Sequence, residues 1–153
     1  VQNNTYNSND KGNDTVNITF KGSSHDMFTD VADLYVYKLP AFLNKIVEES
    51  PFANTERLTD FSFLQSTGMM LEAVSTVNIT IPSNHKVFKK PDNATVSNQF
   101  FDYTVKLTEL KDVIKIERTF HGKTKVIKAA DFKLYKEEME KAYKNDLITL
   151  VLQ

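Results

Sequence analysis

Strict alternation of apolar and polar residues between positions 77 and 120 limits the possible folds of this chain more than any other feature. The segment FFDYTVKL (100–107) has an apolar side chain at every second position, and VIKIERTF (113–120) repeats the pattern. A β-strand points successive side chains to opposite faces, so each segment should bury one face. The polar residues 109–112 between them predict a hairpin turn. VNITIP (77–82) predicts a third strand of the same kind.

Other segments predict further strands with less regular patterns. VNITF (16–20) alternates, and LYVY (34–37) is rich in residues that favour a pleated surface. LITLVL (147–152) is apolar on both faces, which predicts a strand inside a sheet. Further short strands are predicted from Arg57 to Leu64, where Phe61 and Phe63 lie on one side, and through Val87 and Phe88.

Two segments have helical spacing instead. Pro40 and the apolar residues after it predict a short helix near 40–49. Near 131–144 a second helix is predicted, with Asp131 as its N-cap and Glu138 on its wet side. Its apolar stripe consists of Phe132, Tyr135, Met139, Ala142 and Tyr143. The predicted fold class is therefore mainly β, an antiparallel β-sandwich of about seven or eight strands with these two helices.

The chain divides into a short polar segment and one domain. Residues 1–14 (VQNNTYNSNDKGND) contain few apolar side chains, so they should bury too little surface to order, and we expect a flexible N-terminal linker. Residues 15–153 are predicted to form a single β-sandwich domain. The chain begins at Val1 without a signal sequence, so we expect a processed or excised part of a longer protein.

Composition argues against several classes of function. Nineteen basic and twenty acidic residues give a net charge of −1, which argues against nucleic-acid binding, and no apolar run is long enough for a transmembrane segment. Absence of cysteine excludes disulfides, thiolate metal sites and a cysteine nucleophile. His25, His85 and His121 lie far apart, and no Gly-x-Ser-x-Gly motif occurs. We therefore predict no catalytic, cofactor-binding or metal-binding residues; a carboxylate pair assembled by folding is the remaining enzymatic alternative.

Two features within the predicted strands bear on binding and packing. Tyr35 and Tyr37 share one face of their strand, so they form a candidate exposed aromatic face for a glycan or protein unless that strand is buried on both sides. Arg118 falls on the apolar face of its strand. It should either pair with a buried carboxylate or lie at a sheet end with its charged head in water, which is the commoner arrangement.

The order of several motifs resembles one known family. The motifs are Pro51-Phe52 followed by Arg57, the strand VNITIP leading into Lys86-Val87 and Lys90-Pro91, the hairpin, and the closing LYKEEMEKAYKNDLITLVL. From about Leu39 to Leu152 the chain resembles the domain of unknown function found at the C-terminal end of bacterial transglutaminase-like proteins.

This resemblance implies a β-sandwich module beside a papain-like transglutaminase core whose Cys-His-Asp triad would lie outside this chain. It implies export to the periplasm or cell surface and no functional residues of the family here. The expected function is that of a non-catalytic accessory domain, with neighbouring domains of its parent protein, and a protein or glycan of the cell envelope, as partners. The alternatives are a stand-alone ligand-binding domain and a carboxylate-based hydrolase.

Overall fold

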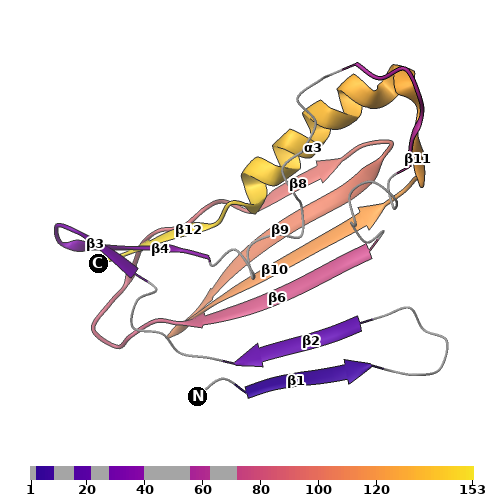
Figure 1. The fold of residues 1–153 in the computed structure, drawn as a ribbon. Helices are drawn as coiled ribbons and strands as arrows, with labels where there is room; N and C mark the ends of the chain where they lie inside the picture. Colours follow the sequence, from indigo (N-terminus) through magenta and orange to yellow (C-terminus); the bar gives the residue numbers. More distant parts are fainter. Residues whose placement is uncertain (1–2, 9–15, 22–27, 40–55, 63–71) are drawn as a thin grey trace.

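The computed structural model describes residues 3–8, 16–21, 28–39, 56–62 and 72–153 (Figure 1). Within them the chain is mostly antiparallel β-sheet with one C-terminal α-helix, which confirms the predicted fold class. The helix predicted near 40–49 and the end of the strand predicted at 57–64 lie outside the described residues. No helix among the described residues is long and apolar enough to cross a membrane.

The larger four-stranded sheet contains the alternating segments. Its order is β6-β10-β9-β8, with bounds Glu72–Thr80 for β6, Ala94–Ser97 for β8, Phe101–Leu110 for β9 and Val113–Gly122 for β10. The predicted hairpin is β9–β10, closed by Lys111 and Asp112, and Lys111 adopts a positive φ of 34° at this turn. The register sets Ile116 opposite Leu107 and Phe120 opposite Tyr103, so the apolar residues of both strands share the buried face.

A smaller four-stranded sheet has the order β3-β4-β12-β7. Its strands are β3 (Phe28–Val31), β4 (Leu34–Lys38), β7 (Val87–Lys89) and β12 (Thr149–Leu152). β12 lies between β4 and β7, with Leu150 and Leu152 buried and Val151 half-buried. The prediction of a C-terminal strand inside a sheet is therefore confirmed.

Two further pairs of strands complete the described β-structure. β5 (Phe61–Ser62) pairs with β11 (Val126–Ile127), and β2 (Val16–Lys21) pairs with β1 (Asn3–Ser8). β2 was predicted, whereas β1 was not, and it lies within residues 1–14, for which a linker was predicted. Pairing uses backbone groups, which polar residues also provide, so a polar composition did not exclude a strand. The domain boundary at residue 15 stays a prediction.

The C-terminal helix α3 (Phe132–Asp146) follows a 3₁₀ turn, η1 (Ala129–Asp131), and runs along β8 and β9 (Figure 1). Four residues of the predicted apolar stripe are buried and Tyr143 is half-buried. Asp131 precedes the helix as predicted, but its side chain makes no capping hydrogen bond. Its backbone is already helical because η1 leads directly into α3, whereas a capping residue is normally extended.

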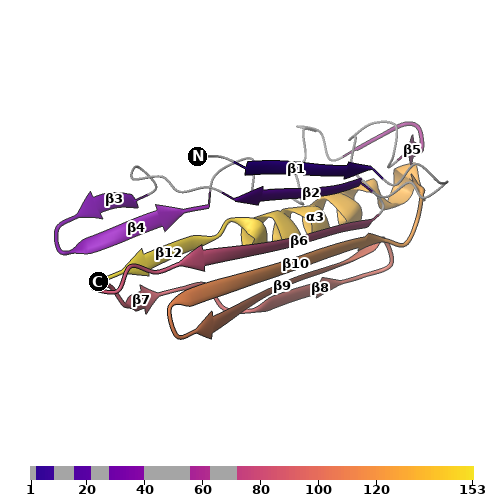
Figure 2. The ribbon, with the colours of Figure 1, turned by 90° about the horizontal axis from the view of Figure 1, so that it is seen from below.

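One hydrophobic core unites these elements. It includes Tyr37 from β4, Tyr103 from β9, Ile116 from β10, Met139 from α3 and Leu150 from β12. α3 runs along the larger sheet, and the smaller sheet lies beyond the end of α3, near the end of the larger sheet that carries the β9–β10 turn (Figure 2), with Leu150 and Leu152 in the same core. The outer face of the smaller sheet therefore points away from the core.

Candidate functional site

The two predicted binding residues, Tyr35 and Tyr37, do not form one exposed aromatic face. Tyr37 is 1% exposed in the core, where it lies opposite Leu150 of β12. Tyr35, near the start of the same strand, is 36% exposed. The Tyr35 ring meets the His85 ring edge-on, with ring centroids 4.5 Å apart. Since side chains alternate along a strand, Leu34 and Val36 point to the outer face instead.

The outer face of the smaller sheet carries apolar residues together with Thr29, Lys38, Lys89 and Thr149, which the register places on the same face. Register sets Val31 of β3 opposite Leu34, and Val36 opposite Val151 of β12. Phe88 lies at the β-bulge of β7, where Lys89 pairs with Val151 and Val87 pairs with Leu152, and Leu147 lies between α3 and β12. Phe88 and Val31 are 61% and 53% exposed, so this face is open to solvent. We call this set the outer apolar face: Val31, Leu34, Val36, Phe88, Leu147 and Val151.

A buried polar cluster links the C-terminal end of α3 to the larger sheet. Arg118 of β10 and Asp146, the last residue of α3, are each 1% exposed, and their Nη1 and Oδ1 atoms are 3.3 Å apart. Arg118 Nη2 donates to Ser75 Oγ at 3.0 Å, and Tyr103 Oη donates to Asp146 Oδ1 at 2.9 Å. Arg118 thus pairs with a buried carboxylate. The commoner arrangement, with the charged guanidinium in water, does not occur here. Asp146 reaches Arg118 because the C-terminal end of α3 lies against the middle of β10.

Burial keeps the Tyr103 phenol of this cluster protonated. Desolvation, and secondarily the negative charge of Asp146, raise the pKa of Tyr103 far above its ordinary value. The phenol therefore stays neutral and remains a hydrogen-bond donor to the carboxylate at every physiological pH. Because Arg118 and Asp146 are both shielded from solvent, the cluster stabilises the fold and offers no surface for a substrate.

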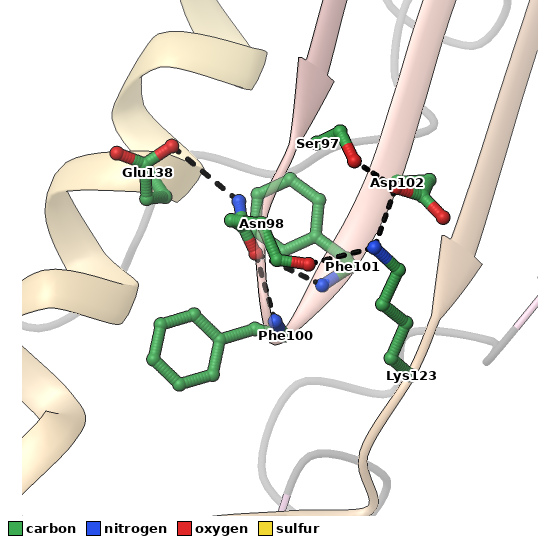
Figure 3. A network of polar contacts seen from close by, with 7 residues as sticks. All are labelled: Ser97, Asn98, Phe100, Phe101, Asp102, Lys123 and Glu138. Carbon is green, nitrogen blue, oxygen red and sulfur yellow. Dashed lines mark hydrogen bonds and ion pairs between the residues drawn. The ribbon is translucent and has the colours of Figure 1, made fainter.

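The turn between β8 and β9 is organised by Asn98 (Figure 3). Asn98 Oδ1 accepts from the backbone N–H groups of Phe100 and Phe101 at 2.8 and 3.0 Å. Its Nδ2 donates to Glu138 Oε2 of α3 at 3.4 Å. Asparagine stabilises turns in this way because its side chain imitates a backbone acceptor. The Asn98 side chain therefore links the turn to the helix.

Lys123 closes the other side of this turn (Figure 3). Its Nζ donates to the Asn98 carbonyl and to Asp102 Oδ1, both at 2.7 Å, and Ser97 Oγ donates to Asp102 at 2.6 Å. The hydrogen bond from Lys123, followed by that from Ser97, lowers the pKa of Asp102 below its ordinary value. Asp102 is exposed and satisfied by these donors, which is the pattern of a structural turn.

A shallow depression of about 240 Å³ lies between the β6–β7 connection and the β9–β10 turn. Its charged lining is balanced, since Lys86 and Lys111 lie there together with Glu109 and Asp112. His85 also borders it, while His121 contacts Glu72 at 3.0 Å and His25 lies outside the described residues. No three potential metal ligands cluster within the described part of the chain.

Comparison with known proteins places the chain by sequence and by fold. No curated protein matches it. Its fold is similar to that of part of a proposed protease from Parabacteroides distasonis ATCC 8503, with a TM-score of 0.59 at 15% sequence identity. The match covers 78% of this chain and 23% of that chain, so the similar region is less than a quarter of the longer protein. Residues 33–152 match the model of the family described as a domain of unknown function with solved structure, DUF3858, and the chain therefore belongs to that family.

Proposed function

We propose that this chain is a non-catalytic accessory domain of a larger exported bacterial protein, and that it packs its outer apolar face against a neighbouring domain. The observation behind this proposal is the face itself. Four apolar side chains from β3, β4 and β12 share one sheet face, and two exposed apolar residues, Phe88 of β7 and Leu147 before β12, lie in or next to the same sheet. Contiguous exposed apolar surface of this kind marks interaction sites in soluble proteins.

The chemistry of the face favours a protein partner over a glycan. Sugars stack on flat aromatic rings that also offer a polar tip, as tyrosine and tryptophan do. Five of the six residues are aliphatic, and the sixth, Phe88, has no polar group. Tyr37 is buried, so the predicted aromatic platform is absent from this surface. An aliphatic face is better matched by the apolar core of a protein interface.

The size of the similar protein supports a neighbouring domain as the partner. The matched region is 23% of the Parabacteroides chain, so a domain of this fold is joined there to a much longer polypeptide. The resemblance to modules of transglutaminase-like proteins supports the further proposals of a transglutaminase-like neighbour and of a periplasmic or cell-surface location.

One observation favours a stand-alone ligand-binding function as a second candidate. Tyr35 is partly exposed beside His85, which borders the shallow depression, so a small ligand could contact both rings. Nothing specific favours hydrolysis at this depression, because Glu109 lies 3.9 Å from Lys90 and Asp112 lies 3.8 Å from Lys111.

Hydrogen exchange of the natural longer protein and of this chain alone tests the proposed function. We expect peptides of β3, β4 and β12 to exchange more slowly in the longer protein. A double variant, Val31→Lys with Phe88→Lys, should abolish this extra protection but change the stability of the isolated chain by no more than about 0.5 kcal/mol per site. Leu134→Lys is the matched control, since Leu134 is an exposed apolar residue on α3. Equal exchange of these strands in both proteins would contradict the proposal.

A further inference from the structure

Two lysines flank the apolar residues on the outer face of the smaller sheet. Lys89 of β7 lies directly opposite Val151, and Lys38 of β4 lies two residues along its strand from Val36. Both lysines are exposed. With about 4.8 Å between neighbouring strands and about 3.4 Å per residue, the Cα atoms of the two lysines are about 12 Å apart. The two positive charges therefore stand on either side of one apolar centre, formed by Val36 and Val151.

Charges on the outer face of the larger sheet are arranged differently. There Lys115 pairs with Glu117 at 2.6 Å and His121 pairs with Glu72 at 3.0 Å, so basic and acidic groups lie side by side. Interspersed charges of both signs are typical of a face that meets water. On the outer face of the smaller sheet, the charged residues that the register places among the described strands are both lysines. Neither is ion-paired with an acidic residue that the structure describes.

We propose that the surface covering the outer apolar face belongs to a neighbouring domain of the same protein and presents carboxylates to Lys38 and Lys89 around an apolar centre. This inference rests on the proposed function and adds to it the chemistry of the partner. Covering the face removes water from the surroundings of both ammonium groups, which is unfavourable unless opposite charges replace that water. Carboxylates on the partner provide this replacement. They also fix the orientation of docking, because a basic surface in the same place would be repelled.

An anionic lipid surface also combines acidic groups with apolar material, but this face is less suited to it. Clusters that bind anionic lipids usually contain about four to eight basic residues, and two are present here. Val36 and Val151 are half-buried within the sheet, so they offer little side-chain surface for insertion between lipids. A folded domain can instead match both the flat apolar centre and the separation of the two charges.

Charge reversal in the natural longer protein tests the chemistry of the partner. Under the proposed function, β4 and β12 exchange amide hydrogens more slowly there than in the isolated chain. Lys38→Glu with Lys89→Glu should reduce this extra protection by about tenfold or more, because like charges would then face each other in the interface. Lys38→Arg with Lys89→Arg should retain it. Lys38→Gln with Lys89→Gln should cause a smaller loss, and this pair keeps the test valid if the reversed charges disturb the fold.

Lys106→Glu with Lys125→Glu is the matched control. Both residues are exposed and lie outside the smaller sheet, and the variant has the same net charge as the reversed pair. It should keep the full extra protection. Circular dichroism of each isolated chain shows whether the variants are folded.

Three outcomes would overturn the acidic partner. If protection survives the reversal of both lysines but is lost in Val31→Lys with Phe88→Lys, the proposed function stands and only the carboxylates are wrong. If the wild-type protein shows no extra protection of these strands, the proposed function and this inference both fail. If the isolated chain sediments with phosphatidylserine vesicles, and reversal of the two lysines abolishes this binding, the face binds anionic lipid.

Discussion

Removing one member of the buried Arg118–Asp146 pair should destabilise the domain more than removing both. Both side chains are 1% exposed, so Asp146→Ala leaves a guanidinium in the core without its carboxylate. Breaking a buried pair in this way costs about 3–5 kcal/mol. Loss of the acceptor for Tyr103 adds about 1 kcal/mol. A domain of this size holds about 5–15 kcal/mol in total, so Asp146→Ala should leave it close to unfolding.

The double variant Arg118→Met with Asp146→Leu separates charge from packing. Apolar residues of similar volume often replace a buried ion pair at little or no cost, because the desolvation penalty of both charges disappears. Ser75 is half-buried and can bond water after Arg118 is removed. We therefore expect the double variant to be more stable than Asp146→Ala, with a coupling energy of about 2 kcal/mol or more between Arg118→Met and Asp146→Leu.

Urea unfolding at pH 7, monitored by tyrosine fluorescence and far-ultraviolet circular dichroism, measures the stability of the single and double variants. Glu117→Ala is the control, because the Glu117–Lys115 pair lies at the surface and its loss should leave the unfolding midpoint nearly unchanged. The argument is refuted if Asp146→Ala shifts the midpoint no more than Glu117→Ala does. It also fails if the effects of Arg118→Met alone and of Asp146→Leu alone are simply additive in the double variant.

Three further predictions concern the helix, the β8–β9 turn and the N-terminal segment. Met139→Ala should lower the free energy of unfolding by about 2–5 kcal/mol, whereas the exposed Glu140→Ala should change it by about 0.5 kcal/mol or less; similar urea midpoints would contradict this. Lys123→Ala should raise the pKa of Asp102 towards its ordinary value in a carboxyl-carbon NMR titration. Because that pKa is lowered by folding, its stabilising effect exists at neutral pH and disappears as pH falls through the folded value, so Lys123→Ala should weaken this acid dependence. Deleting 1–14 should leave a cooperative transition within a few degrees of the parent by calorimetry, since the family match begins at residue 33.

Long periodic segments could be predicted from the sequence, and short ones could not. β9 and β10 have ten residues each and α3 has fifteen, so their repeats identified both the element and its buried face. β3 and β8 have four residues each and were missed. Four residues contain only two apolar–polar alternations, and so short a pattern cannot be distinguished from a loop. Such short strands form because they pair with neighbouring strands, not because of their intrinsic propensity.

Glu138 shows how a tertiary neighbour changes the environment of one helix face. Helical periodicity placed Glu138 on the wet side of α3, yet its side chain is 15% exposed. The β8–β9 turn approaches there, and Asn98 and Lys141 both contact the carboxylate. Position on a helix predicts exposure only where no loop packs nearby. For this reason Glu140, and not Glu138, is the appropriate surface control for Met139→Ala.

Strand alternation likewise determines which residues share a face but not which face is buried. The sequence grouped Tyr35 with Tyr37 and Leu34 with Val36 correctly, but either pair could have pointed outwards. The choice depends on where β12 places Leu150, which lies opposite Tyr37 and enters the core. The same holds for Arg118. The sequence showed that it lies on the apolar face, but its partner is 28 residues away at the end of α3 and could not be identified. Both the outer apolar face and the buried ion pair are therefore products of how α3 and β12 pack, and no local pattern could have revealed them.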